Sequence, residues 1–157
     1  MRGPIPGVQP LVMPLLYSFT QVREDLARYT AGITQEQLWR RTGELPSLGF
    51  HLRHISGSVE RLTTYLMGEQ VSAEQIAFLK EEGVPGPTLE ELLAAIDTTL
   101  SATEARVRTI DPATVHDPRY IGRKRLPTTV LGLLMHLAEH TQRHLGQAIT
   151  TAKLVRS

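Results

Sequence analysis

Apolar residues recur along this chain at intervals of three and four positions, which places them on one face of an α-helix. Four long segments carry this pattern, and each is expected to form an amphipathic helix. They run from between Pro10 and Pro14 to about Ala31, from Ser47 to about Met67, from Thr88 to Ile110 and from Thr128 to about Lys153. No segment alternates apolar and polar residues as a half-buried strand does. The sequence therefore predicts an all-α protein.

Capping residues mark the starts of two shorter helices. Thr34 and Gln37 have the spacing of a capping box, in which each side chain bonds the backbone N–H of the other residue. This pair predicts a short helix through Arg41. Ser72 and Gln75 repeat the spacing and predict a second short helix between two of the long ones.

Four amphipathic helices in 157 residues predict a single domain over residues 1–157, built as a four-helix bundle. About twenty residues connect the second and third long helices, which is longer than an antiparallel turn requires. We therefore expect a crossover connection, with these two helices parallel and the four in up-down-down-up order. Residues 112–127 are expected to be irregular, with Thr128 capping the last helix.

Composition narrows the classes of function. The chain has 17 Lys and Arg against 16 Asp and Glu, and this near balance argues against a dedicated nucleic-acid binder. It has no cysteine, which excludes disulfides, thiolate metal sites and cysteine nucleophiles. Prolines interrupt the apolar N-terminal segment, and no segment approaches the roughly 18 apolar residues of a membrane span. A cytoplasmic protein without a membrane partner is expected.

Histidines are the most informative polar residues, because five of the six fall within two of the predicted long helices. His136, His140 and His144 are spaced four apart, so their imidazoles form one stripe that drifts by about 40° per step. On a helical wheel, His140 and His144 lie where the apolar face begins, and His136 lies nearer to solvent. Two imidazoles at positions i and i+4 can chelate one metal ion.

The other two histidines, His51 and His54, lie at the border of the apolar face of the second long helix. One of them meeting the pair on the last helix would supply three neutral nitrogen ligands and leave one coordination position open, as catalytic metal sites require. The helical wheel does not choose between the two. The alternative is that each is a hydrogen-bonded core histidine without a metal.

Two segments resemble the DinB-like superfamily of metalloenzymes: PSLGFHLRHISGSVERLTTYLMGE and GRKRLPTTVLGLLMHLAEHTQRHLGQAITT. The resemblance implies an up-down-down-up four-helix bundle that holds a divalent metal ion. It assigns the metal ligands to His54, His140 and His144, the last being marked by the Gly146-Gln147 pair that follows. Zinc or nickel is the ion we expect, with iron as the alternative, because nitrogen ligation suits all three. Members commonly form homodimers, so a homodimer is also expected.

Known members of the superfamily include thiol S-transferases, so the resemblance implies a small-molecule substrate, and a thiol in particular. Three neutral imidazoles leave the metal charge uncompensated and favour an anionic fourth ligand, either a substrate thiolate or, for a hydrolase, hydroxide. Candidate catalytic residues for proton transfer are His51, His136 and Tyr65, and Arg61 is a candidate for binding an anionic group of the substrate. Leu145 stands where many relatives carry Arg.

Two other classes of function stay open. The protein could be a metal-binding homodimer without catalysis. It could also bind nucleic acid through the basic residues of the irregular stretch, although its near-neutral charge argues against this. These basic residues are Arg119, Arg123, Lys124 and Arg125.

Overall fold

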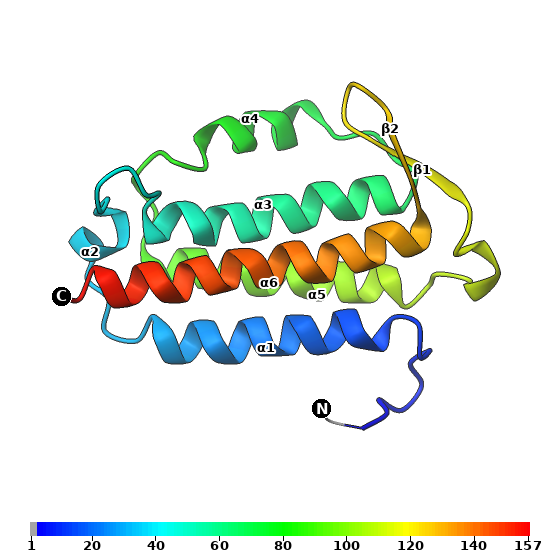
Figure 1. The fold of residues 1–157 in the computed structure, drawn as a ribbon, viewed down its shortest axis with the longest axis horizontal. Helices are drawn as coiled ribbons and strands as arrows, with labels where there is room; N and C mark the ends of the chain where they lie inside the picture. The colour runs from blue at the N-terminus through cyan, green and yellow to red at the C-terminus, as the bar shows by residue number, and fades with distance from the viewer. Residues whose placement is uncertain (1–2) are drawn as a thin grey trace.

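The computed structural model describes residues 3–157, and most of them are helical, in agreement with the predicted all-α class. In chain order, the elements are α1 (Met13–Tyr29), α2 (Gln35–Trp39), α3 (Leu48–Leu66), α4 (Ala73–Glu81), α5 (Leu89–Val107), the 3-10 turn η1 (Pro112–Thr114), β1 (Pro118–Ile121), β2 (Leu126–Thr129) and α6 (Val130–Leu154) (Figure 1). None of the described helices is long and apolar enough to cross a membrane.

The four long helices, α1, α3, α5 and α6, lie alongside one another (Figure 1). Helix α3 packs against both α5 and α6, and α1 packs against α6 and α5. In Figure 1, α3 and α5 both run from left to right, whereas α1 and α6 run in the opposite direction. The connection between α3 and α5 returns along the length of the molecule and contains α4, which lies over α3.

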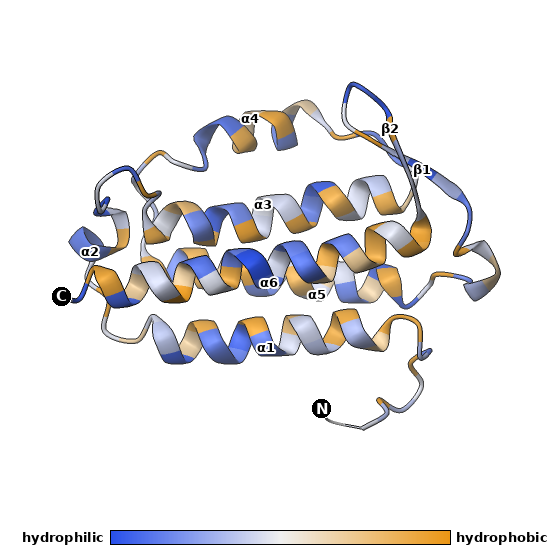
Figure 2. Ribbon diagram, viewed as in Figure 1, coloured by the Kyte–Doolittle hydropathy of each residue, from blue (hydrophilic) through white to orange (hydrophobic). Residues whose placement is uncertain are grey.

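The apolar faces of the long helices enclose a hydrophobic core. Its largest fully buried side chains come from every long helix and include Phe19, Leu52, Leu100 and Leu137. Figure 2 shows apolar and polar residues mixed along each of these helices, with a hydrophilic stretch in the middle of α6. His136, His140 and His144 lie in the middle part of α6, between buried residues nearer its two ends such as Leu133 and Ala152.

The expected caps are present at most helix starts. Thr34, Ser72 and Thr88 each form a complete capping box, and the Ser47 hydroxyl accepts a hydrogen bond from the backbone N–H of Phe50. These caps satisfy backbone N–H groups that have no partner within the helix. The predicted helix starts were therefore right to within a residue at these four sites.

Three boundary predictions were wrong. Helix α2 ends at Trp39 and does not reach Arg41. Thr129, and not Thr128, is the N-cap of α6, because its hydroxyl accepts the backbone N–H of Gly132 at 3.1 Å. Thr128 instead belongs to β2. Helix α5 ends at Val107 and does not reach Ile110.

The stretch 112–127 was expected to be irregular, and this prediction was wrong in part. The stretch contains the first strand and the start of the second strand of an antiparallel hairpin. Pro118 pairs with Thr129 and Ile121 with Leu126. Strands of four residues are too short to show alternation in the sequence, which is why the pattern did not reveal them. The guanidinium of Arg119 donates to the carbonyl of Leu66 at 2.7 Å, which docks the hairpin onto the end of α3.

Candidate metal centre

Three histidines from two helices meet where α3 packs against α6. His54 of α3 and His140 and His144 of α6 each offer a nitrogen, and these nitrogens lie within 4.8 Å of one another. The Nε2 atoms of His54 and His140 are 3.1 Å apart, and the ring centroids of His54 and His144 are 4.2 Å apart. The structure thus brings together the three residues to which the resemblance to the DinB-like superfamily assigns metal ligation.

This arrangement has the dimensions of a metal site. Zinc binds histidine nitrogen at about 2.0–2.1 Å, and tetrahedral geometry then separates two such nitrogens by about 3.3 Å. The 3.1 Å between Nε2 of His54 and Nε2 of His140 is close to that separation. All three side chains are partly buried, so a divalent cation is compatible with both the donor set and the spacing.

Two of these histidines are poor bases. Burial, together with repulsion from His54 when that ring is protonated, lowers the pKa of His140 to about 4 and the pKa of His144 to about 3. Both imidazoles are therefore neutral at pH 7. A metal ligand must have a free lone pair, so these two residues do not have to lose a proton before they can bind an ion.

Glu82, which the sequence analysis did not single out, supports the third histidine. It follows α4 as its C-cap and is only 1% exposed. Its Oε2 atom lies 2.6 Å from Nδ1 of His54, and its Oε1 atom lies 2.9 Å from Nη2 of Arg61. A carboxylate accepts the Nδ1–H bond, so Nε2 of His54 keeps its lone pair facing His140.

Gly57 allows this carboxylate to approach α3. A Cβ atom at position 57 would lie 2.6 Å from Oε1 of Glu82, 2.7 Å from Cε1 of Phe78 and 2.8 Å from Nη1 of Arg61. Contacts under 3 Å are too short for any side chain, so only glycine leaves room here. Gly57, three residues after His54, is thus the sequence signal of a buried carboxylate that a distant part of the chain supplies.

Helix α4 depends on polar contacts to stay in place, because none of its residues is buried. Arg53 of α3 donates from Nη1 to the carbonyls of Glu81 at 2.5 Å and of Val84 at 3.0 Å. Its guanidinium also lies 5.0 Å from the ring centroid of Phe78. These contacts hold the end of α4, and with it Glu82, against the histidine site.

The family model described as the DinB superfamily matches residues 18–148. The chain belongs to the DinB superfamily. No sequence among the curated proteins matches it. The matched range begins within α1 and ends within α6, so all three converging histidines lie inside the part of this DinB-superfamily protein that resembles its relatives.

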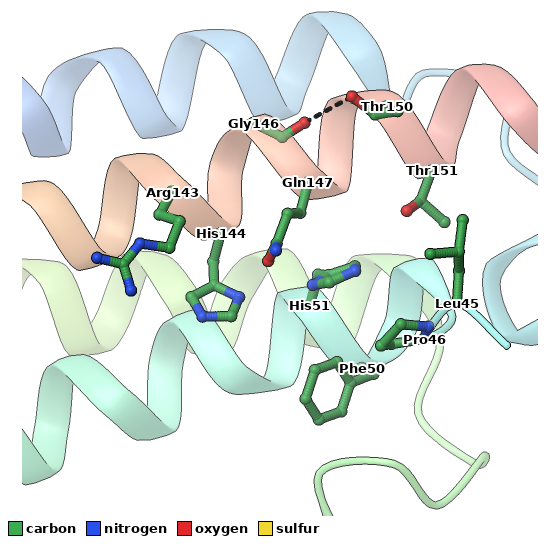
Figure 3. Close-up of a pocket in the computed structure, with 10 residues that line it drawn as sticks. All are labelled: Leu45, Pro46, Phe50, His51, Arg143, His144, Gly146, Gln147, Thr150 and Thr151. Atoms are coloured by element: carbon green, nitrogen blue, oxygen red, sulfur yellow. Dashed lines mark hydrogen bonds between the residues drawn. The ribbon is translucent and has the colours of Figure 1, made fainter.

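His51 lies beside the three histidines of this DinB-superfamily protein but is not one of them. It is 4% exposed, its buried Nδ1 has no hydrogen-bond partner, and its ring centroid is 5.8 Å from that of His144. Burial lowers its pKa to about 4. Figure 3 shows His51 on α3 and His144 on α6 lining one cavity, with Gln147 between them in this view; the cavity is about 490 Å³.

A second cavity, of about 580 Å³, opens on the other side of the histidines. His54 and His140 line it, together with three other candidates from the sequence analysis: Arg61, Tyr65 and His136. The histidine site therefore lies between two cavities, of which one contacts His144 and the other contacts His54 and His140.

His136 has 39% of its side chain exposed, in line with the position nearer to solvent that the helical wheel predicts. Its Nδ1 lies 2.6 Å from Oε1 of Glu139, whose other oxygen lies 2.6 Å from Nη2 of Arg143. His136, Glu139 and His140 form a second group that could hold an ion. Glu139 is already paired with a cation, which favours the group of three histidines.

Proposed function

We propose that this DinB-superfamily protein is a divalent-metal-dependent enzyme that transfers a thiol sulfur onto an electrophilic small molecule, on a bundle of four helices in up-down-down-up order. His54, His140 and His144 would hold the ion, with zinc or nickel expected and iron as the alternative. The observation that carries the proposal is the convergence of three imidazole nitrogens from two helices, with 3.1 Å between two of them.

A divalent ion held by neutral ligands would keep a thiol sulfur in its nucleophilic, deprotonated form at pH 7. In the transfer, sulfur forms a bond to an electrophilic carbon of the second substrate, and the leaving group departs with the electron pair. We assign the movement of the thiol proton to Tyr65 and His136, which line the cavity next to His54 and His140, or to His51 in the other cavity. Cavities on both sides of the histidines favour a reaction of two molecules.

Hydrolysis is the second candidate function, because the same open position beside neutral ligands can activate a water molecule. Hydrolysis needs only one organic substrate besides water, so it gives no role to the cavity on the His144 side, which His51, Arg143 and Gln147 help to line. The two reactions are separated by whether turnover requires an added thiol.

The metal content of the purified protein tests the proposal. We expect about one divalent ion per chain in the native protein and a near-complete loss in His140→Ala, because two remaining imidazoles hold an ion far more weakly. His116→Ala is the matched control, since His116 is exposed and lies outside the site. Equal metal content in the two variants would overturn the assignment of the site.

Turnover is tested separately. The metal-loaded protein is incubated with a low-molecular-weight thiol and 1-chloro-2,4-dinitrobenzene, and thioether formation is followed by its absorbance. We expect a rate above the uncatalysed reaction that disappears in His140→Ala. Turnover of an ester substrate without any thiol would instead support the hydrolase.

A further inference from the structure

The cavity beside His54 and His140 is formed by four different elements. Helix α3 contributes one wall, α4 and the β1–β2 hairpin cover it, and α6 supplies the histidines. Much of its lining is apolar, and these side chains are Leu62, Val71, Ile76, Leu79 and Ile121. Its volume, about 580 Å³, is typical of a cavity for a small organic molecule.

The charged groups of this lining are all cationic. They are Arg61 of α3, Lys80 of α4 and Arg123 in the hairpin turn, and no Asp or Glu of residues 3–157 lines the cavity. Arg61 is already neutralised by its ion pair with Glu82. Within the described part of the chain, neither Lys80 nor Arg123 forms an ion pair with a carboxylate. The cavity thus carries two positive charges without a protein counterion.

We propose that this cavity binds the carboxylate end of an anionic small molecule through Lys80 and Arg123, with the apolar part of the molecule against Leu62 and Ile76. An anion is the ligand that compensates the two cations, and guanidinium groups are suited to carboxylates because they donate two parallel hydrogen bonds. If the molecule is the thiol substrate, the inference rests on the proposed function, and it then says that this thiol carries a carboxylate. Binding of the anion itself depends only on the cavity.

Neighbouring cations of the same hairpin turn provide the control. Lys124 and Arg125 follow Arg123 directly but do not line the cavity. Lys80→Ala/Arg123→Ala and Lys124→Ala/Arg125→Asn remove the same total charge, so any long-range electrostatic effect is equal in the two proteins. Asn is used at position 125 because the backbone there has φ of +46°, which Asn tolerates better than Ala.

The experiment measures affinity by calorimetry on the zinc-loaded protein with four probes. Mercaptosuccinate is an anionic thiol, thioglycerol a neutral one and cysteamine a cationic one, whereas succinate is an anion without sulfur. We expect mercaptosuccinate to bind about tenfold more tightly than thioglycerol, and cysteamine to bind more weakly than both, since exposed cations add modestly to binding. Lys80→Ala/Arg123→Ala should remove the preference and weaken succinate binding, and the control variant should keep both.

The outcomes separate this inference from the proposed function. Equal affinity for the three thiols, or the same loss in both double variants, would overturn the anion site and leave thiol transfer standing. Succinate binding that depends on Lys80 and Arg123, together with no gain from the sulfur of mercaptosuccinate, would support the anion site and refute the thiol role. Because both cations are exposed, the variants should fold, and circular dichroism checks that they do.

Discussion

Gly57→Ala is the change that most directly tests how Glu82 supports the histidine site. The added methyl group would lie 2.6 Å from Oε1 of Glu82 and 2.8 Å from Nη1 of Arg61. Both atoms are ends of side chains, so they can move. However, Glu82 is 1% exposed and bonded to His54, so a shift that relieves the clash with its Oε1 disturbs its bond to that histidine.

The expected magnitudes follow from two opposing effects. Crowding a packed site costs about 1–3 kcal/mol, while alanine stabilises a helix interior by about 0.5–1 kcal/mol relative to glycine. The two ranges together give a fall of up to about 2.5 kcal/mol in the free energy of unfolding, and we expect about 1 kcal/mol, which lowers Tm by roughly 2–4 °C for a protein of this size. Metal affinity should fall by about 10–100-fold, as is usual when a ligating histidine loses its hydrogen-bonded carboxylate.

Gly146→Ala is the matched control, because Gly146 also lies inside a long helix but has nothing within 4 Å of a Cβ atom. This variant should gain about 0.5–1 kcal/mol of stability from helix propensity and keep its metal affinity. Tm is measured on metal-free protein, and zinc affinity by competition with a chromogenic chelator. If Gly57→Ala matches Gly146→Ala in both measurements, the carboxylate does not act through His54 as argued.

Three further outcomes are expected. Metal content should be retained in His51→Ala and His136→Ala, with any turnover reduced, but lost in His54→Ala. Loss of metal in His51→Ala with retention in His54→Ala would show that His51, and not His54, is the ligand from α3. The metal-free protein should become less stable as pH falls from about 6.5 towards 4. Burial holds the pKa of His140 at about 4 and that of His144 at about 3, so in this range the unfolded chain binds more protons than the folded one. A free energy of unfolding, measured in urea, that does not change across this pH range would contradict the prediction. Light scattering at micromolar concentration should give the mass of a homodimer, and a monomer would count against that prediction.

The sequence by itself determined the helices of this protein, because helix formation depends on residues that are near one another in the chain. A hydroxyl at Ser47 and the capping box of Thr34 act within one turn, and the periodic apolar residues define which face is buried. The same local geometry puts His140 and His144 one turn apart at the edge of that face. The hairpin escaped the pattern because its four-residue strands are too short to show an alternation of apolar and polar residues.

Tertiary structure decided which groups meet those two histidines. His51 and His54 are nearly equivalent on the helical wheel, but the packing of α3 on α6 brings Nε2 of His54 to His140 and leaves His51 beside His144 in the cavity on the other side. Glu82 lies 28 residues from His54, in a connection whose path follows from the packing of other elements. A carboxylate in such a segment looks like any exposed acid in the sequence, and only folding buries it against the histidine, since burial depends on contacts between residues far apart in the chain.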